Sequence, residues 1–292
     1  MKLWRFSTLW KQLPKQLETR KKVSRDRIRM IALACVGVYL ALLAALYIFQ
    51  SKIIYLPGRA EWAAAQLAQP AHPRFAPLDV TTSDGLTLRG LWAPAQDKLQ
   101  TIVVFHGNAD NIRTIAIPMV SLVEGGYGVV LVEYRSYNGQ QGTPSEQGLY
   151  ADARAFIEAL KSRGVDEKNI ALYGHSLGTG VATQMAVEYP DIAALALAAP
   201  YLSVAKMAQR RFPIFPAELL TIDRFDNLAK IAQIKAPVLI GHGDKDIVIP
   251  LSHGKRLFAA AREPKTFFQF TGKEHNNILE NFNGKLMDWL EK

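Results

Sequence analysis

This chain of 292 residues is short of two things: it has one cysteine, and one long stretch of it carries no charge. Because Cys35 is the only cysteine, an intramolecular disulfide and a metal site built from thiolates are both excluded. The lack of disulfides is compatible with an oxidising or a reducing compartment. No internal repeat is visible.

The stretch without charge covers residues 30–49. A helix rises 1.5 Å per residue, so this run spans about 30 Å, the thickness of the hydrocarbon core of a bilayer. We therefore predict a transmembrane helix over residues 30–50. A buried core helix is disfavoured by the uniform apolarity, and a cleaved signal peptide by the long leading segment and the length of the run.

Positive charge is concentrated ahead of that stretch. Residues 1–29 hold ten lysines or arginines and two acidic residues, so they account for +8 of the net charge of +9. Such a flank is expected to stay cytoplasmic and to lie on anionic headgroups, which places the rest of the chain outside, in the periplasm if the source is bacterial. Because the remainder is nearly neutral, nucleic acid is not an expected partner. The prediction is a single-pass protein of the cell (inner) membrane.

The rhythm of the remaining chain predicts one α/β domain over residues 76–292, reached through a juxtamembrane helix and linker over residues 51–75. Two strands around Asp84-Gly85 are expected to form a hairpin, and short apolar strands then alternate with helices, which implies a mostly parallel sheet covered on both faces. The alternation lapses over residues 200–236, which we interpret as a small cap. The expected strands lie at 78–82, 86–92, 101–105 and near residues 129, 170, 194, 238 and 267.

A serine between two glycines is the strongest sequence signal for chemistry. Gly174-His175-Ser176-Leu177-Gly178 follows an apolar run and precedes a helix-like segment, residues 181–188. A tight strand-to-helix turn forces the serine into a strained backbone conformation, and glycine neighbours let strand and helix approach each other. We therefore interpret Ser176 as a nucleophile.

A serine alcohol needs an imidazole to accept its proton and a carboxylate to orient that imidazole. Asp246 and His275 follow later apolar strands, so the three side chains are expected to meet beyond the carboxyl ends of the strands. Asp244 is the alternative acid, although it is more typical of a residue that braces the turn. His253 is the alternative base, although we expect it to be an exposed helix residue.

Backbone donors for an oxyanion are expected in the loop after residues 101–105. The N–H groups of Asn108 or Ala109, together with that of Leu177, are the candidates, and losing one such donor typically costs roughly 100- to 1000-fold in rate. Asp110 is expected to cap the helix that follows. This chemistry needs neither a metal ion nor an organic cofactor.

These motifs resemble those of membrane-anchored α/β-hydrolase-domain serine hydrolases, in the branch with a His-Gly-Asn oxyanion loop. The resemblance runs from about Gln50 to the C-terminus, and residues 133–146 extend it because they match the Tyr-Arg-Gly-Tyr-Gly-x-Ser-x-Gly-x-Pro loop of that branch. Ser136 and Asn138 replace glycines there, and Gln140 replaces a serine.

The resemblance and the residues together imply a tethered serine hydrolase of the carboxylesterase, lipase or thioesterase type. Its expected substrate is an acyl ester or thioester, with a membrane lipid among the candidates. Two alternatives remain: a non-enzymatic protein of the same fold that binds a lipid or a partner, and a serine peptidase. The sequence gives no oligomeric state.

Overall fold

The computed structural model describes residues 6–57 and 72–292, with side chains from residue 25 onward. The chain divides into two compact units, Met1–Gln50 and Ser51–Lys292, and each is described by itself. Much of the predicted linker, residues 58–71, lies outside the described residues.

From Phe6 onward the first unit is a single helix, α1 (Phe6–Ile54), whose last residues belong to the second unit. Its stretch Arg25–Ile54 is apolar enough to cross a membrane, with a mean hydropathy of 2.5 in its most apolar window and none of that window buried. The helix is longer than the predicted residues 30–50 because the basic segment from Phe6 onward is also helical. A signal sequence would have the same composition, whereas a buried core helix would not be exposed in this way.

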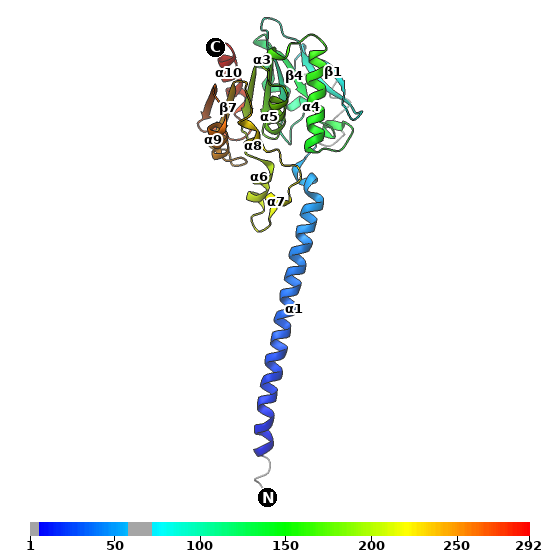
Figure 1. The fold of residues 1–292 in the computed structure, drawn as a ribbon, viewed down its shortest axis with the longest axis vertical. Helices are drawn as coiled ribbons and strands as arrows, with labels where there is room; N and C mark the ends of the chain where they lie inside the picture. The colour runs from blue at the N-terminus through cyan, green and yellow to red at the C-terminus, as the bar shows by residue number, and fades with distance from the viewer. Residues whose placement is uncertain (1–5, 58–71) are drawn as a thin grey trace. The chain divides into compact units, whose positions relative to one another are not determined.

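The second unit is built on an eight-stranded sheet in the order β1-β2-β4-β3-β5-β6-β7-β8 (Figure 1). The β1–β2 and β2–β4 pairs are antiparallel and every other pair is parallel, as the alternating pattern predicts. The strands are β1 (Ala76–Thr81), β2 (Thr87–Ala93), β3 (Thr101–Phe105), β4 (Gly128–Val132), β5 (Ile170–His175), β6 (Ala194–Ala198), β7 (Val238–Gly243) and β8 (Lys265–Phe270).

Helices cover both faces of this sheet. The α3 and α10 helices pack against each other and, with one set of inward-facing strand residues, form one apolar cluster. The α4, α5, α8 and α9 helices contribute to a second cluster on the other face. Strands β3 to β7 are buried along their whole length, which is why their sequences are continuously apolar. These helices are α3 (Ile112–Glu124), α4 (Glu146–Lys161), α5 (Gly178–Glu188), α8 (Asn227–Ile231), α9 (Leu251–Ala260) and α10 (Leu279–Leu290).

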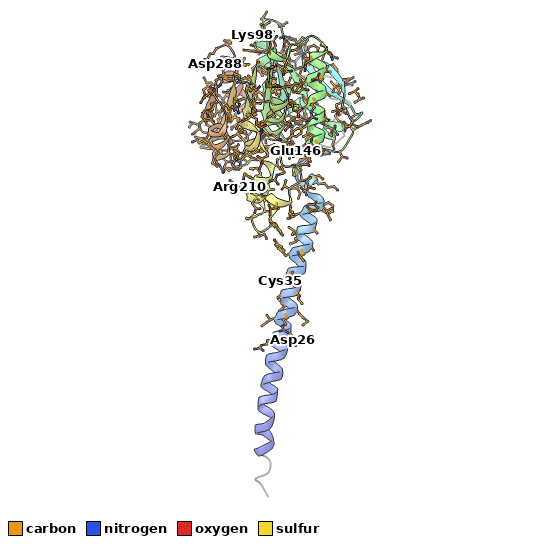
Figure 2. The ribbon with its side chains drawn as sticks, in the orientation of Figure 1. Asp26, Cys35, Lys98, Glu146, Arg210 and Asp288 are labelled. Atoms are coloured by element: carbon orange, nitrogen blue, oxygen red, sulfur yellow. The ribbon has the colours of Figure 1, made fainter. Side chains whose placement is uncertain are left out.

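The region predicted as a cap contains short helices that lie off the end of the sheet (Figure 1). The α6 helix (Val204–Arg211) packs on α7 (Ala217–Leu220), and α8 follows. Glu146, labelled in Figure 2 at the start of α4, holds this region through its carboxylate, which accepts a hydrogen bond from the Arg224 N–H at 2.6 Å. The cap is therefore fixed to the helical layer.

Candidate active site

Ser176 occupies the sharp turn between β5 and α5 that the sequence predicts. Its φ of 50° is unusual for a residue with a side chain, so the backbone there is strained. A Cβ atom on Gly178 would overlap the carbonyl of Phe105, and one on Gly174 would come within 2.6 Å of the Gly178 oxygen. Both flanking glycines are thus required for strand and helix to approach.

Three strand ends bring Ser176, His275 and Asp246 together. His275 Nε2 lies 2.9 Å from Ser176 Oγ, and His275 Nδ1 lies 2.7 Å from Asp246 Oδ2. Because a carboxylate accepts hydrogen bonds, Nδ1 carries the proton and Nε2 is left to accept the serine hydroxyl. This is the geometry that a serine nucleophile with an oriented base requires.

Asp246 is held in one orientation by its own loop. Its Oδ1 accepts hydrogen bonds from the backbone N–H groups of Val248 at 2.9 Å and Ile249 at 2.8 Å, and His242 Nε2 lies 3.4 Å from Oδ2. Burial acts to raise the pKa of Asp246, but the contacts with His242 and His275 outweigh it and hold the pKa well below the usual range. The carboxyl is therefore ionised beside the imidazole.

The competing acid and base lie elsewhere. Asp244 Oδ1 accepts a hydrogen bond from Gly272 N–H at 2.7 Å, so it holds the loop after β7 to the loop after β8. His253 is half-buried rather than exposed, which makes the expectation for it wrong, and its Nδ1 accepts the Leu202 N–H at 3.2 Å. Burial and the positive charge of Arg210 lower the pKa of His253 to about 4, so it is neutral at pH 7.

Asp110 does not cap α3, contrary to the expectation. Asn111 does so, because its side chain accepts hydrogen bonds from the N–H groups of Arg113 and Thr114 in a capping box. Asp110 Oδ2 instead lies 3.4 Å from Nδ1 of the buried His175, whose ring centre is 5.4 Å from that of His275. Burial opposes ionisation of Asp110, yet the contact with His175 lowers its pKa.

A cavity of about 540 Å³ opens beside the nucleophile, within the ~300–1,000 Å³ typical of small-molecule sites. Ser176, Asn108 and Leu177 line it, whereas Ala109 does not. Its remaining lining is apolar apart from Tyr201 and two arginines, one of which, Arg210, is labelled in Figure 2. The other lining residues are Ile53, Ile54, Val204, Met207, Ala208, Arg211, Phe212, Ile247, Val248 and Ile249.

Among the described residues, no acceptor takes a hydrogen bond from the backbone N–H of Asn108, Ala109 or Leu177. The side chain of Asn108, unlike its N–H, has protein partners. Its Oδ1 accepts hydrogen bonds from Leu56 N–H at 2.9 Å and Tyr137 Oη at 2.7 Å. Asn108 and Leu177 share the cavity with Ser176, whereas Ala109 is not among its lining residues.

A buried pair, His106 and Glu133, was not anticipated from the sequence and lies directly before the oxyanion loop. His106 Nε2 lies 2.9 Å from Glu133 Oε1, His106 Nδ1 lies 2.7 Å from Gly107 O, and both side chains are fully buried. Burial acts to lower the pKa of His106, but Glu133 raises it above the usual value. A histidine and a glutamate after neighbouring strands were the available signal.

No metal-binding cluster of three or more His, Cys, Asp or Glu residues is found in the described part of the chain. The site's polar groups are instead a hydroxyl, an imidazole, a carboxylate and backbone N–H donors. These groups suit attack on a carbonyl carbon.

The fold and this site define an α/β hydrolase, and the chain belongs to the α/β-hydrolase family. A family model described as Hydrolase_4, serine aminopeptidase S33, matches residues 96–224. An uncharacterized Mycobacterium tuberculosis protein is 35% identical over 263 residues, covering 89% of this chain and 90% of the relative. Human alpha/beta hydrolase domain-containing protein 17B is 30% identical over 230 residues, covering 77% of this chain and 76% of the relative.

Solved structures share the fold at low sequence identity. A Pyrococcus furiosus esterase superposes with a TM-score of 0.62 at 18% identity, covering 81% of this chain and 95% of that chain. A puromycin hydrolase superposes with a TM-score of 0.61 at 19% identity, covering 75% of this chain and 39% of that chain. An esterase and a puromycin hydrolase thus share this architecture, so the fold alone does not decide the reaction.

Proposed function

We propose that this protein is a membrane-tethered serine hydrolase that cleaves acyl esters or thioesters through an acyl-enzyme. The observation that carries the proposal is the chain of contacts from Asp246 through His275 to the hydroxyl of a strained serine beside an apolar cavity. The name of the Pyrococcus furiosus esterase, a protein with this fold, supports the same class of reaction.

The mechanism follows from the atoms that face one another. His275 Nε2 takes the proton of Ser176 as Oγ forms a bond to the substrate's carbonyl carbon, and Asp246 stabilises the imidazolium. The N–H groups of Asn108 and Leu177 stabilise the negative oxygen of the tetrahedral intermediate. His275 then returns the proton to the departing alcohol or thiol. A water molecule repeats the sequence on the acyl-serine and releases the acid.

A lipid-like acyl group is the substrate class that best fits the cavity. Its lining is mostly apolar, and an acyl chain gains roughly 0.8 kcal/mol for each buried CH₂ group. The tether supports the same choice, since it keeps the enzyme next to lipids and lipidated molecules. We assign it to residues 30–50, with the basic residues 1–29 in the cytoplasm and the domain of residues 76–292 outside.

Two observations weigh on the peptidase alternative. The serine aminopeptidase description of the matching family model favours it. The charged residues that line the cavity, Arg210 and Arg211, are both cationic, so the lining offers no carboxylate for the amino group of a peptide. We therefore place ester or thioester hydrolysis first.

The test is labelling of the full-length protein in membranes with a fluorophosphonate probe. We expect labelling of the unmodified protein and none of Ser176→Ala, and hydrolysis of p-nitrophenyl esters but not of an aminopeptidase substrate. Equal labelling of Ser176→Ala would refute the nucleophile. Turnover of the aminopeptidase substrate alone would establish the peptidase alternative, and turnover of neither substrate would support the binding protein.

A further inference from the structure

The candidate span, Arg25–Ile54, ends inside the catalytic unit, and a juxtamembrane segment crosses that end. This juxtamembrane segment, residues 53–56, belongs to the same compact unit as Ser176. Ile53 and Ile54 line the cavity that contains Ser176. Tyr55 is only 2% exposed, and its ring meets the ring of Phe225 edge-on, with 6.4 Å between the centres. Tyr55 therefore anchors the segment in the domain, while Ile53 and Leu56 remain 45% and 52% exposed.

The last residue of the segment is bonded to the oxyanion loop. Leu56 N–H donates to Asn108 Oδ1 at 2.9 Å, across 52 positions of sequence, and Tyr137 Oη donates to the same oxygen at 2.7 Å. A carbonyl oxygen has two lone pairs, so both are used. The two donors fix the side chain of the residue whose own backbone N–H is the proposed oxyanion donor.

We propose that the juxtamembrane segment is a working part of the catalytic site. Ile53 and Ile54 form a wall against which the substrate's acyl chain binds. Leu56 and Tyr137 are positioning residues, which hold Asn108 so that its N–H points at the oxyanion. This inference rests on the proposed acyl hydrolysis. It adds that the acyl pocket is completed by residues at the end of the candidate span, so a long acyl chain is bound beside the point where that helix ends.

The two roles have different kinetic signatures. A misplaced oxyanion donor weakens binding of the transition state more than binding of the substrate, so it lowers kcat and leaves KM nearly unchanged. A change in the apolar wall alters the binding of long acyl chains more than that of short ones. A segment that only packs against the domain would lower stability without producing either pattern.

The positioning role is tested with a matched pair of substitutions in the full-length protein. Leu56→Pro removes the N–H donor, whereas Leu56→Ala keeps it and removes only a half-exposed side chain. We expect Leu56→Pro to lower kcat by roughly 10- to 100-fold at similar KM, because displacements of about 1 Å cost up to ~100-fold. The kcat of Leu56→Ala should fall by less than about threefold, since the N–H stays in place.

Tyr137→Phe provides a second test in case the proline variant does not fold. It deletes only the hydroxyl that also donates to Asn108 Oδ1. It should lower kcat in the same sense by a smaller factor, while its KM and melting temperature stay near those of the unmodified protein. Unchanged kcat in folded Tyr137→Phe, or equal kcat for Leu56→Pro and Leu56→Ala, would overturn the positioning role.

The wall is tested by acyl-chain selectivity. In Ile53→Trp the larger ring takes up cavity volume, so the ratio of kcat/KM for p-nitrophenyl dodecanoate to that for the acetate should fall at least about tenfold. Ile48→Trp is the control on the same helix, since Ile48 is exposed and does not line the cavity. An unchanged ratio in Ile53→Trp would overturn the wall.

Measuring Ser176→Ala in the same assays distinguishes failure of the proposed function from failure of the role given to the juxtamembrane segment. If turnover does not depend on Ser176, the proposed function is wrong. If turnover depends on Ser176 but kcat and the chain-length ratio do not change on substitution within residues 53–56, only the role of the juxtamembrane segment is wrong.

Discussion

The two shortest histidine–carboxylate contacts among the described residues, His275–Asp246 and His106–Glu133, differ in what surrounds them. His275 and Asp246 are 2.7 Å apart, and the imidazole side chain is 11% exposed. His106 and Glu133 are 2.9 Å apart, and neither side chain is exposed. The second nitrogen of His275 faces the hydroxyl of Ser176, whereas that of His106 faces the carbonyl oxygen of Gly107.

The difference shows that the contact between histidine and carboxylate does not decide the function. His106 has an acceptor on each side, so each ring nitrogen can donate a hydrogen bond and the protonated ring is favoured, in agreement with the direction in which Glu133 shifts its pKa. Such a ring has no free lone pair for a proton. His275 has a hydroxyl on one side, so it keeps a lone pair for catalysis. We infer that the first pair is reactive and that the second supports the oxyanion loop.

The largest expected effect is the loss of turnover in His275→Ala. Without the imidazole nothing accepts the serine proton, so kcat should fall by about 10⁴-fold or more. Stability should fall less than in a variant that strips a buried carboxylate of its partner, because Asp246 keeps its hydrogen bonds from the Val248 and Ile249 N–H groups. Ester hydrolysis and thermal unfolding check both halves, and nearly full activity in the variant would remove the distinction between the two pairs.

The acid loop offers a control within one turn of chain. Asp246→Asn should lower kcat by about 10³- to 10⁴-fold, because an amide no longer stabilises the imidazolium. Asp244→Asn should cost less than about tenfold, since that carboxylate bonds a backbone N–H away from the imidazole. Steady-state kinetics on the two variants are the measurement, and the reverse ranking would reassign the acid.

The buried pair should respond in stability instead. His106→Ala leaves Glu133 buried without its partner, which typically costs about 3–5 kcal/mol. The double variant His106→Ala, Glu133→Ala should lose less than the sum of the two single changes, because it leaves no uncompensated charge. Denaturant unfolding measures this coupling, and strictly additive losses would show that the pair does not act as a unit.

The smallest expected effect concerns pH. The folded-state pKa of His253 is about 4, against about 6.5 when unfolded, so the unfolded chain binds more protons between these values. The free energy of unfolding should therefore have its full value above about pH 6.5 and fall by about 1–3 kcal/mol as the pH approaches 4. His253→Gln should show a shallower loss over that range, and identical pH profiles would contradict the assignment.

Local pattern was enough to predict the elements that carry the site. Continuous apolar runs located strands β3 and β5, and the two glycines around Ser176 predicted a turn that admits no Cβ atom. The order of serine, aspartate and histidine after successive strands predicted their meeting, because parallel strands end at the same edge of the sheet. The α/β-hydrolase fold follows from the same alternation.

Contacts between distant segments could not be predicted in this way. Nothing near Leu56 in the sequence indicates its hydrogen bond to Asn108. For His106 the only signal is that it and Glu133 each follow a strand, and strand pairing has to be known before that signal identifies the partner. The sequence predicts Asp110 as the cap of α3, whereas the cap is Asn111, because aspartate and asparagine at adjacent positions both serve as caps. Choosing between them requires the tertiary contact of Asp110 with His175.

The central claim is that the hydroxyl of Ser176 becomes acylated during turnover. The direct measurement is mass spectrometry of the full-length protein mixed with a p-nitrophenyl ester and quenched in acid within the first turnover, followed by peptide mapping. We expect a mass increase equal to the acyl group on the peptide that contains Ser176. Continued ester hydrolysis with no such adduct, or with the acyl group on another residue, would contradict it.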